Sequence, residues 1–394
     1  MTTPPARPGN VLGLSVAIAS ITAVGLGLSL TIPLLSLTLE SRGVAPGWIG
    51  INTAASGLAS MVATPFVPRL AARFGTGMVL AICILASAAM LPFFYVVESF
   101  PLWFPLRLVS GAAIGGAFVL SEFWIADAAP AARRGFVMGI YATVFSLGLA
   151  LGPALLALTG TTGFLPFGVG AAVMAVAALP VMVAPVTSPR LDSHPSRSFL
   201  RFLTAAPVAT AAALVFGLAE SSSFALLPVY GTHVGHPASM VIFLASAVTI
   251  GNVALQLPLG MLSDRMDRRR LLLVLAFIGF AGAALLPLAI ADFSEAIILL
   301  FVWGGCIGGL YTVGLAHLAQ RFTGADLAAA NSTFLFAYSG GVLVGPALLG
   351  LSIEAWDPHG FAAALAFCFL LYFVLVLARM ANLRRSPNAD APGP

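Results

Sequence analysis

The sequence predicts an all-α membrane protein with twelve transmembrane helices arranged as two parallel six-helix repeats. First, 60% of the 394 residues are hydrophobic and only 8% are charged, and the mean hydropathy is +1.03. Second, apolar runs long enough to cross a bilayer recur along most of the chain. Third, the chain resembles itself at an offset of 192 to 193 residues. The composition excludes a soluble fold, and the other two observations give the number and order of the helices.

Each predicted helix is an apolar run that can span a hydrocarbon core, for which about 20 residues suffice. These runs occupy residues 11–36, 48–67, 77–97, 101–125, 136–160, 163–187, 203–230, 238–262, 271–292, 295–320, 328–353 and 360–379. The first run is longer than the apolar core of a signal peptide and lacks a convincing cleavage site, so we interpret it as a helix of the mature protein.

The basic residues predict the orientation of the helices. All 18 are arginines, since the sequence contains no lysine. Arg42 falls on one side of the predicted membrane and Arg107 within a helix. The others share the opposite side: Arg7, Arg69, Arg73, Arg133, Arg134, Arg190, Arg197, Arg201, Arg265, Arg268, Arg269, Arg270, Arg321, Arg379, Arg384 and Arg385. By the positive-inside rule that side and both termini are cytoplasmic, which suits a multi-pass protein of a bacterial inner membrane. The net charge of +4 therefore reports topology and gives no support for nucleic-acid binding.

Two pairs of matching segments show the internal repeat. Residues 33–43 match residues 225–235 at an offset of 192, and residues 148–156 match residues 341–349 at an offset of 193. Six helices separate the copies, an even number, so the halves share one orientation. We expect an N-terminal half at 1–186, a polar cytoplasmic connector at 187–202 and a C-terminal half at 203–394. Such repeats place a cavity at their interface and transport by alternating access.

One charged segment separates two apolar runs in the second half. Residues 260–270, Gly-Met-Leu-Ser-Asp-Arg-Met-Asp-Arg-Arg-Arg, hold six charged side chains and cannot lie in lipid, so we expect a tight loop between two helices. Its copy at 68–77 has Ala72 at the position of Asp264. The two halves have therefore diverged at this connection.

These residues resemble signatures of the major facilitator superfamily. Gly260-x3-Asp264-Arg265-x2-Arg268-Arg269 is similar to the loop signature between helices 2 and 3, and again 8 and 9, of that family, and Arg107-x3-Gly111 is similar to its helix-4 arginine motif. A looser similarity to the YcaD-like branch lies in Ser121-Glu-Phe-Trp124, Arg134-Gly135 and Gly139-Ile-Tyr141. The resemblance covers nearly the whole chain and implies a transporter.

The resemblance also implies a cytoplasmic gate. In the family the equivalent of Asp264 is linked to that gate, so Asp264, Arg265, Arg268 and Gly260 become gating candidates. A carboxylate there can accept from neighbouring arginines and from amides at the start of a facing helix. Because Ala72 cannot do so, only the second half would carry a charged lock. The alternative is that these arginines only enforce topology.

A further pattern is similar to a helix-5 signature of drug:proton antiporters in the same superfamily. It consists of Gly139-x8-Gly148-x3-Gly152-Pro153, although Leu156 and Ala157 replace its closing glycines. Small residues four apart let helices approach closely, and a proline permits a bend. Gly148, Gly152 and Pro153 are therefore gating candidates in an exporter. Generic close packing is the alternative, because the second half repeats the pattern at Gly341, Gly345 and Pro346.

Glu220 is the most conspicuous single acidic residue within a predicted helix. It lies about ten residues from the outer end of its helix, which at about 1.5 Å per residue places it near mid-membrane. A carboxyl group there is costly and usually faces a cavity or a partner. We expect Glu220 to carry the coupling proton, with recognition of a cationic substrate or a structural polar contact as alternatives.

Arg107 lies about six residues inside its helix and cannot readily lose its charge. It must face a carboxylate, carbonyl groups, water or an anionic substrate. The family resemblance implies proton coupling, and anion binding or structural pairing remain open. Glu122 and Asp127, at the cytoplasmic end of the same helix, are expected to pair with Arg133 or Arg134.

The resemblance implies that helices 1, 4, 7 and 10 line the cavity. The candidate substrate-binding residues on them are Ser29, Thr31, Ser110, Ser221, Phe224, Trp303, Tyr311, Thr312 and His317. This mostly neutral, aromatic lining suits an amphipathic or weakly charged organic solute. His317 could also relay protons or simply pack, and Asn331, Ser332 and Tyr338 are weaker candidates.

The sequence shows no enzyme or cofactor constellation. A phosphate-binding Gly-x4-Gly-Lys-Ser/Thr loop is impossible without lysine, so we do not expect ATP-driven pumping by this chain. Cys83, Cys306 and Cys368 lie within predicted helices without metal-ligand spacing, so we expect them to pack and expect no bound metal. Transport energy must then come from a gradient of ions or solutes.

The leading hypothesis is a monomeric inner-membrane transporter that exports a small amphipathic compound in exchange for protons. Its partners would be the solute, protons and the lipid bilayer, without a cofactor. The first alternative is proton-linked uptake of a metabolite, sugar or siderophore-like solute. The second is a membrane sensor that binds its ligand without transporting it.

Overall fold

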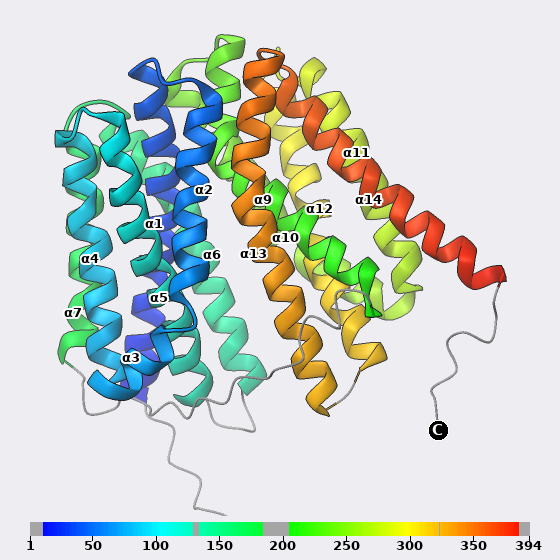
Figure 1. Ribbon diagram of the computed structural model, residues 1–394, viewed down its shortest axis with the longest axis horizontal. Coiled ribbons are helices and arrows are strands. Elements are labelled where there is room, and N and C mark those ends of the chain that lie inside the picture. Colours follow the sequence, from blue (N-terminus) through cyan, green and yellow to red (C-terminus); the bar gives the residue numbers. More distant parts are fainter. Residues whose placement is uncertain (1–10, 129–133, 184–204, 323, 386–394) are drawn as a thin grey trace, which may run out of the picture. The chain divides into compact units, whose positions relative to one another are not determined.

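The protein is helical throughout the part of the chain that its computed structural model describes, which comprises residues 11–128, 134–183, 205–322 and 324–385. Within these residues lie twelve helices of 18 residues or more (Figure 1). They are α1 (Val11–Ser41), α2 (Pro46–Ala63), α4 (Thr76–Val96), α5 (Trp103–Ala128), α6 (Arg134–Thr159), α7 (Leu165–Val183), α9 (Pro207–Val234), α10 (Ala238–Arg265), α11 (Arg268–Ala289), α12 (Phe293–Arg321), α13 (Gly324–Ala355) and α14 (Gly360–Arg385). A short helix, α3 (Val67–Phe74), and a 3-10 turn, η1 (Phe100–Leu102), complete the set. The predicted all-α fold class is confirmed.

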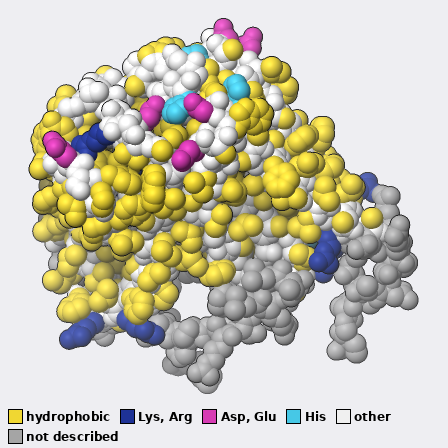
Figure 2. Space-filling view, turned by 45° about the horizontal axis from the view of Figure 1, so that its top comes forward, with side chains coloured by type: hydrophobic (Ala, Val, Ile, Leu, Met, Phe, Trp, Pro, Cys, Tyr) yellow, Lys and Arg dark blue, Asp and Glu magenta, His cyan; other side chains and the backbone are white. Residues whose placement is uncertain are grey.

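The helices have the length and composition of membrane spans. In the described ranges ten are long and apolar enough to cross a bilayer, and α6 adds a shorter apolar stretch, Leu147–Thr159. Hydrophobic side chains cover most of the sides of the helices in view in Figure 2, and charged ones gather toward the helix ends. A surface of this kind is stable only in lipid, so the chain is a multi-pass membrane protein.

The chain divides into two compact units. Unit 1 comprises residues Met1–Val44 and Ile51–Pro195, and unit 2 comprises Ala45–Gly50 and Ser196–Pro394. Within unit 1, α1 packs on α5, α6 and α7, and α4 packs on α5 and α7. Within unit 2, α9 packs on α10, α12, α13 and α14, and α11 packs on α12 and α14. The predicted connector, 187–202, lies outside the described residues.

Glycines make the same close helix contact in both units. In unit 1, a Cβ on Gly25 of α1 would meet the carbonyl oxygen of Phe145 at 2.7 Å, and one on Gly148 of α6 would meet that of Thr22 at 2.7 Å. The residues 192 or 193 positions later repeat this contact in unit 2, where Gly217 of α9 abuts Tyr338 and Gly341 of α13 abuts Leu214. Backbones approach this closely only where a side chain is absent. We call these contacts the glycine seams.

A second pair of helices repeats in the same way. Gly111 of α5 packs on the backbone of Ser56 in α2, and its counterpart Gly304 of α12 packs on that of Val248 in α10. One turn later, Gly115 and Gly308 pack on the side chains of Ser60 and Asn252. The duplication seen in the sequence therefore extends to the packing of single residues.

The single arginine predicted on the far side of the membrane closes a helix end. Arg42 follows α1 and donates from Nη1 to the Val97 carbonyl at 2.9 Å and from Nη2 to the Tyr95 carbonyl at 3.1 Å. Its guanidinium also lies 5.2 Å from the centre of the Trp103 ring. A cation at the carbonyl end of a helix is favourable. Arg42 thus has a local structural role at the end of α4, which accounts for its position opposite the other arginines.

The charged connection in unit 2 is shorter than residues 260–270. Because α10 continues to Arg265 and α11 begins at Arg268, only Met266 and Asp267 lie between them. The Asp267 carboxylate caps α11 by accepting from the Arg270 amide at 2.9 Å. The predicted tight connection is therefore two residues long, and most of its charges stand on helix ends.

The equivalent connection in unit 1 is a helix. Residues Val67–Phe74 form α3, with Pro68 in the first turn, where a missing amide hydrogen costs nothing. Val67 and Ala71 are buried on one face, whereas Arg69 and Arg73 are exposed on the other. The sequence comparison predicted an equivalent position for this segment but did not predict its helical structure.

Candidate functional site

Glu220 is held by a tyrosine from a neighbouring helix of unit 2. It lies at the middle of α9, and the Tyr338 hydroxyl of α13 donates to its Oε2 atom at 2.6 Å. The glycine seam determines this distance, because Gly217, one turn before Glu220, contacts the backbone of Tyr338. The result is an ionisable carboxyl group in the middle of a membrane-spanning helix with one hydroxyl donor fixed on it.

Aromatic rings surround this hydrogen bond. The Tyr338 ring stacks on Phe216 with centroids 6.0 Å apart and meets Tyr311 edge-on at 5.8 Å. Tyr311 also contacts Phe216 at 5.7 Å and Phe334 at 5.1 Å. The four rings come from α9, α12 and α13. They provide apolar faces beside Tyr338 of the kind that bind organic solutes.

The corresponding positions of unit 1 are apolar. The residues 192 before Glu220 and 193 before Tyr338 are Leu28 and Phe145. Phe145 lies on the unit 1 glycine seam, against Gly25. The packing is thus repeated while the acid and its donor occur in unit 2.

Arg107 is buried in unit 1 beside Asn52. The side chain is only 2% exposed, and its Nε atom donates to the Oδ1 atom of Asn52 in α2 at 2.9 Å. The guanidinium carbon lies 5.9 Å from the centre of the Phe94 ring of α4. Arg107 Nη2 and Asn52 Nδ2 are buried without a hydrogen-bond partner among the described residues. The pair therefore leaves two donors unmatched.

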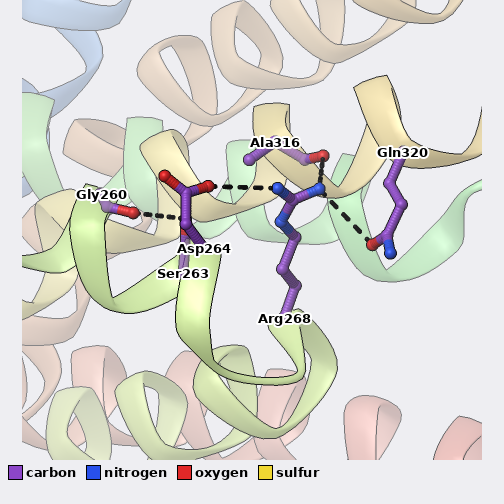
Figure 3. A network of polar contacts seen from close by, with 6 residues as sticks. All are labelled: Gly260, Ser263, Asp264, Arg268, Ala316 and Gln320. Atoms are coloured by element: carbon purple, nitrogen blue, oxygen red, sulfur yellow. Dashed lines mark hydrogen bonds and ion pairs between the residues drawn. The ribbon is translucent and has the colours of Figure 1, made fainter.

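Two of the predicted gating residues, Asp264 and Arg268, belong to a network at the ends of α10, α11 and α12 (Figure 3). The Arg268 guanidinium donates from Nη1 to the Ala316 carbonyl of α12 at 2.7 Å and, at 3.5 Å, to Gln320 Oε1. Its Nη2 atom lies 3.4 Å from Asp264 Oδ1 of α10. The Asp264 side chain is 74% exposed, so this ion pair contributes little to stability in water. The stronger contact is that of Arg268 with the carbonyl end of α12.

The other two gating candidates of that signature are Gly260 and Arg265. The Gly260 carbonyl accepts from Ser263 Oγ at 2.8 Å, and a Cβ on Gly260 would meet no atom within 4 Å. Arg265 is exposed. Its role as a gating residue remains a prediction.

Arg268→Gln is expected to loosen the last turn of α12, because the charged donor on the Ala316 carbonyl is lost. The free energy of unfolding should fall by about 1 kcal/mol. Hydrogen–deuterium exchange of the residues after Ala316 measures the local effect. Arg265→Gln removes the same charge from an exposed neighbouring position and should leave that exchange unchanged, and equal acceleration in both variants would contradict this assignment.

The glycines of the antiporter-like signature lie on the unit 1 glycine seam. A Cβ on Gly152 would meet Ser29 Oγ of α1, and one on Gly148 would come within 3.2 Å of the Leu26 amide nitrogen. Pro153 is buried within α6. These contacts show tight packing of α6 on α1, and the gating role of the three residues remains a prediction.

Three predicted substrate-binding serines bond to nearby backbone. Ser29 Oγ donates to the Leu26 and Gly148 carbonyls, each at 3.3 Å. Ser110 Oγ donates to the Arg107 carbonyl at 3.2 Å and Ser221 Oγ to the Gly217 carbonyl at 2.8 Å. Their hydroxyl hydrogens are thus occupied, although each oxygen can still accept.

The other predicted substrate-binding residues differ in their surroundings. Trp303 is 3% exposed and donates from its indole nitrogen to the Gly279 carbonyl of α11 at 2.9 Å, which places it in helix packing. Thr312 Oγ1 and His317 Nδ1 are buried without a hydrogen-bond partner in the described ranges. Thr31 and Phe224 are half-buried. Only Tyr311 belongs to the aromatic group around Tyr338.

The sequence predicted Tyr338 only as a weak substrate-binding candidate and did not predict a role for Asn52. The repeat offset pairs Tyr338 with Phe145, and the two residues differ only in the tyrosine hydroxyl. This difference between the halves could have pointed to Tyr338. Asn52 was detectable as an amide within an apolar run. The side chains of Glu122, Asp127, Arg133 and Arg134 lie outside the described part of the chain, so their predicted pairing stays a prediction.

Two parallel six-helix repeats, with a half-buried acid in the middle of a helix of one and a buried arginine in the other, are typical of a helical secondary transporter. The sequence matches the family model of the Major Facilitator Superfamily over residues 17–243 and 209–394. The chain therefore belongs to the Major Facilitator Superfamily.

Individual relatives and structures agree with this family. The chain is 26% identical over 359 residues to the MFS-type transporter YfkF of Bacillus subtilis, with 88% of each sequence covered. It is 24% identical over 281 residues to the MFS-type transporter YcaD of Escherichia coli, covering 70% of this chain and 72% of YcaD. A bacterial homologue of the human lysosomal transporter Spinster, in an inward-facing and occupied conformation, has the same fold with a TM-score of 0.77, 16% identity and 99% and 100% coverage.

Proposed function

We propose that this transporter exports a small amphipathic organic compound in exchange for protons by alternating access. It would act as a monomer in a bacterial inner membrane with both termini in the cytoplasm, as the arginine distribution indicates. The observation that carries the proposal is the Glu220–Tyr338 hydrogen bond among aromatic rings in mid-helix. No permanently charged group could serve there as a proton carrier.

The hydrogen bond makes protonation of Glu220 a structural event. As a carboxylate, Glu220 only accepts hydrogen bonds, and the Tyr338 hydroxyl satisfies it at 2.6 Å. Protonation removes the negative charge and turns one carboxyl oxygen into a donor, so the Tyr338 hydroxyl is left with a neutral acceptor and its hydrogen bond weakens. Because α9 and α13 meet at a glycine seam, a change at this contact acts directly on the pairing of two helices. The proton can thus bias which conformation of the transporter is favoured.

Arg107 cannot carry the proton itself, because a guanidinium keeps its charge. Any part that it has in coupling would be electrostatic. We assign the proton to Glu220, which is the member of the predicted coupling pair that can titrate.

We also propose that Asp264 and Arg268 belong to the cytoplasmic gate. Their network connects the ends of α10, α11 and α12 within unit 2, so one charge change there affects three helices. The lock is expected in unit 2, since unit 1 has Ala72 at the equivalent position.

Purified protein in liposomes with an imposed pH gradient tests the function. A panel of labelled amphipathic solutes should include at least one that moves opposite to the proton gradient and stops moving when an ionophore collapses the gradient. Movement in the same direction as protons would identify uptake symport instead. Binding of solutes without any movement across the membrane would identify a sensor and refute transport.

A further inference from the structure

We infer that Arg107 and Asn52 form a binding site for a carboxylate, so that the transported solute is an amphipathic organic acid. This assignment of the substrate class rests on the proposed function, whereas the carboxylate site itself rests on the geometry of unit 1.

The chemistry of Arg107 determines the orientation of Asn52. A guanidinium has five N–H donors and no acceptor, so the atom of Asn52 that faces Arg107 Nε at 2.9 Å must be the amide oxygen. The Asn52 amide nitrogen then becomes the remaining free group. Reversing the amide would place two donors against each other, which excludes the opposite orientation.

Both unmatched groups of the pair are donors. Arg107 Nη2 and Asn52 Nδ2 are buried and have no partner among the described residues. A buried donor without an acceptor is costly, the more so when it belongs to a charged group. An acceptor oxygen satisfies either group, and an anionic oxygen also forms the stronger, charge-assisted hydrogen bond with the Arg107 guanidinium.

The surroundings favour a carboxylate with an apolar body. The Phe94 ring contacts the Arg107 guanidinium and offers it no hydrogen-bond acceptor in the ring plane. Gly111, one turn after Arg107, packs on the backbone of Ser56 and holds α5 and α2 together at this point. The two donors are thereby fixed before a ligand arrives, which reduces the entropy that binding costs. The two oxygens of a carboxylate offer one acceptor to each of these donors.

Binding of benzoate to the purified transporter tests the site. At matched ionic strength, benzoate should raise the melting temperature in a saturable manner, whereas its neutral isostere benzamide should bind at least about tenfold more weakly. Equal shifts from benzoate and benzamide would overturn the assignment. A shift from orthophosphate without one from benzoate would replace the organic acid by an inorganic anion and also overturn it.

Two variants locate the effect. Asn52→Asp places a carboxylate of the protein against Arg107 and should abolish the benzoate shift without lowering the melting temperature of the free protein. Arg107→Gln should weaken benzoate binding at least about tenfold, and Arg69→Gln, at an exposed position of α3, should not. Persistence of the benzoate shift in folded Asn52→Asp protein would refute the site even if Arg107→Gln fails to fold.

The same assay separates this inference from the proposed function. Glu220→Gln should retain benzoate binding, because Glu220 bonds to Tyr338 within unit 2, whereas Arg107 and Asn52 belong to unit 1. Loss of proton-driven transport with intact benzoate binding supports both assignments. Proton-driven transport that survives Glu220→Gln would refute the coupling role of Glu220. It would not affect the assignment of the carboxylate site.

Discussion

Glu220→Gln is expected to abolish transport driven by a pH gradient while leaving the protein folded. Glutamine has nearly the same size and can still accept from the Tyr338 hydroxyl through its amide oxygen, so the helix contact survives. It cannot bind and release a proton, and gradient-driven flux should fall to the level of empty liposomes. Exchange of labelled for unlabelled solute without a gradient should continue, because that reaction requires no net proton movement.

Two comparisons make the Glu220 result specific. Glu354→Gln changes an exposed glutamate of α13 and should leave gradient-driven flux unchanged. Tyr338→Phe keeps the ring but removes the donor, and we expect an intermediate loss of about tenfold, since a hydrogen bond to a charged group contributes about 1.5–3 kcal/mol. If Glu220→Gln retained full gradient-driven flux, another group would carry the proton.

Much of the fold followed from the sequence for simple physical reasons. Apolar runs must become helices in lipid, where the backbone has no other partner, and a copy at a constant offset must adopt the same fold. The features that the sequence did not predict concern the local structure of single segments. Residues Val67–Phe74 form α3 although their copy ends in a two-residue loop, because Pro68 and the alternation of buried Ala71 with exposed Arg73 favour a surface helix there.

The candidate site was only half predictable. Glu220 and Arg107 stand out because a charge in an apolar run is rare and costly. Their partners, Tyr338 and Asn52, lie 118 and 55 residues away along the chain, and these pairings depend on how each helix is rotated about its axis. Composition contains no record of that rotation. For the same reason Trp303 was assigned to a lining on helix number alone, whereas its indole nitrogen bonds to Gly279 in the packing of α11 and α12.

The unit 2 glycine seam provides the second large prediction, because two adjacent glycines of α13 differ in their surroundings. A Cβ on Gly341 would collide with the Leu214 carbonyl oxygen and lie 2.7 Å from the Leu218 amide nitrogen, both backbone atoms of α9. A Cβ on Gly340 would meet only the end of the Leu214 side chain, at 3.5 Å. Gly341→Ala must therefore push α9 and α13 apart, while Gly340→Ala need not.

We expect Gly341→Ala to lower the free energy of unfolding by about 1–3 kcal/mol, the usual cost of overpacking. Gly340→Ala should be neutral or stabilising by up to about 1 kcal/mol, because alanine favours the helix over glycine. Thermal unfolding of the two purified variants in one detergent measures the difference. Similar melting temperatures for the pair would show that α9 and α13 do not depend on the seam.

Transport by the same variants connects the seam to the proton site. Tyr338 lies one turn before Gly341 on α13, so separating the helices also moves its hydroxyl away from Glu220. Gly341→Ala protein that remains folded should consequently lose gradient-driven flux by about tenfold or more, as Tyr338→Phe does. Combining Gly341→Ala with Tyr338→Phe should then add little to either single loss, because both act on one hydrogen bond. Additive losses would instead mean that the seam serves transport by a route that does not pass through Glu220.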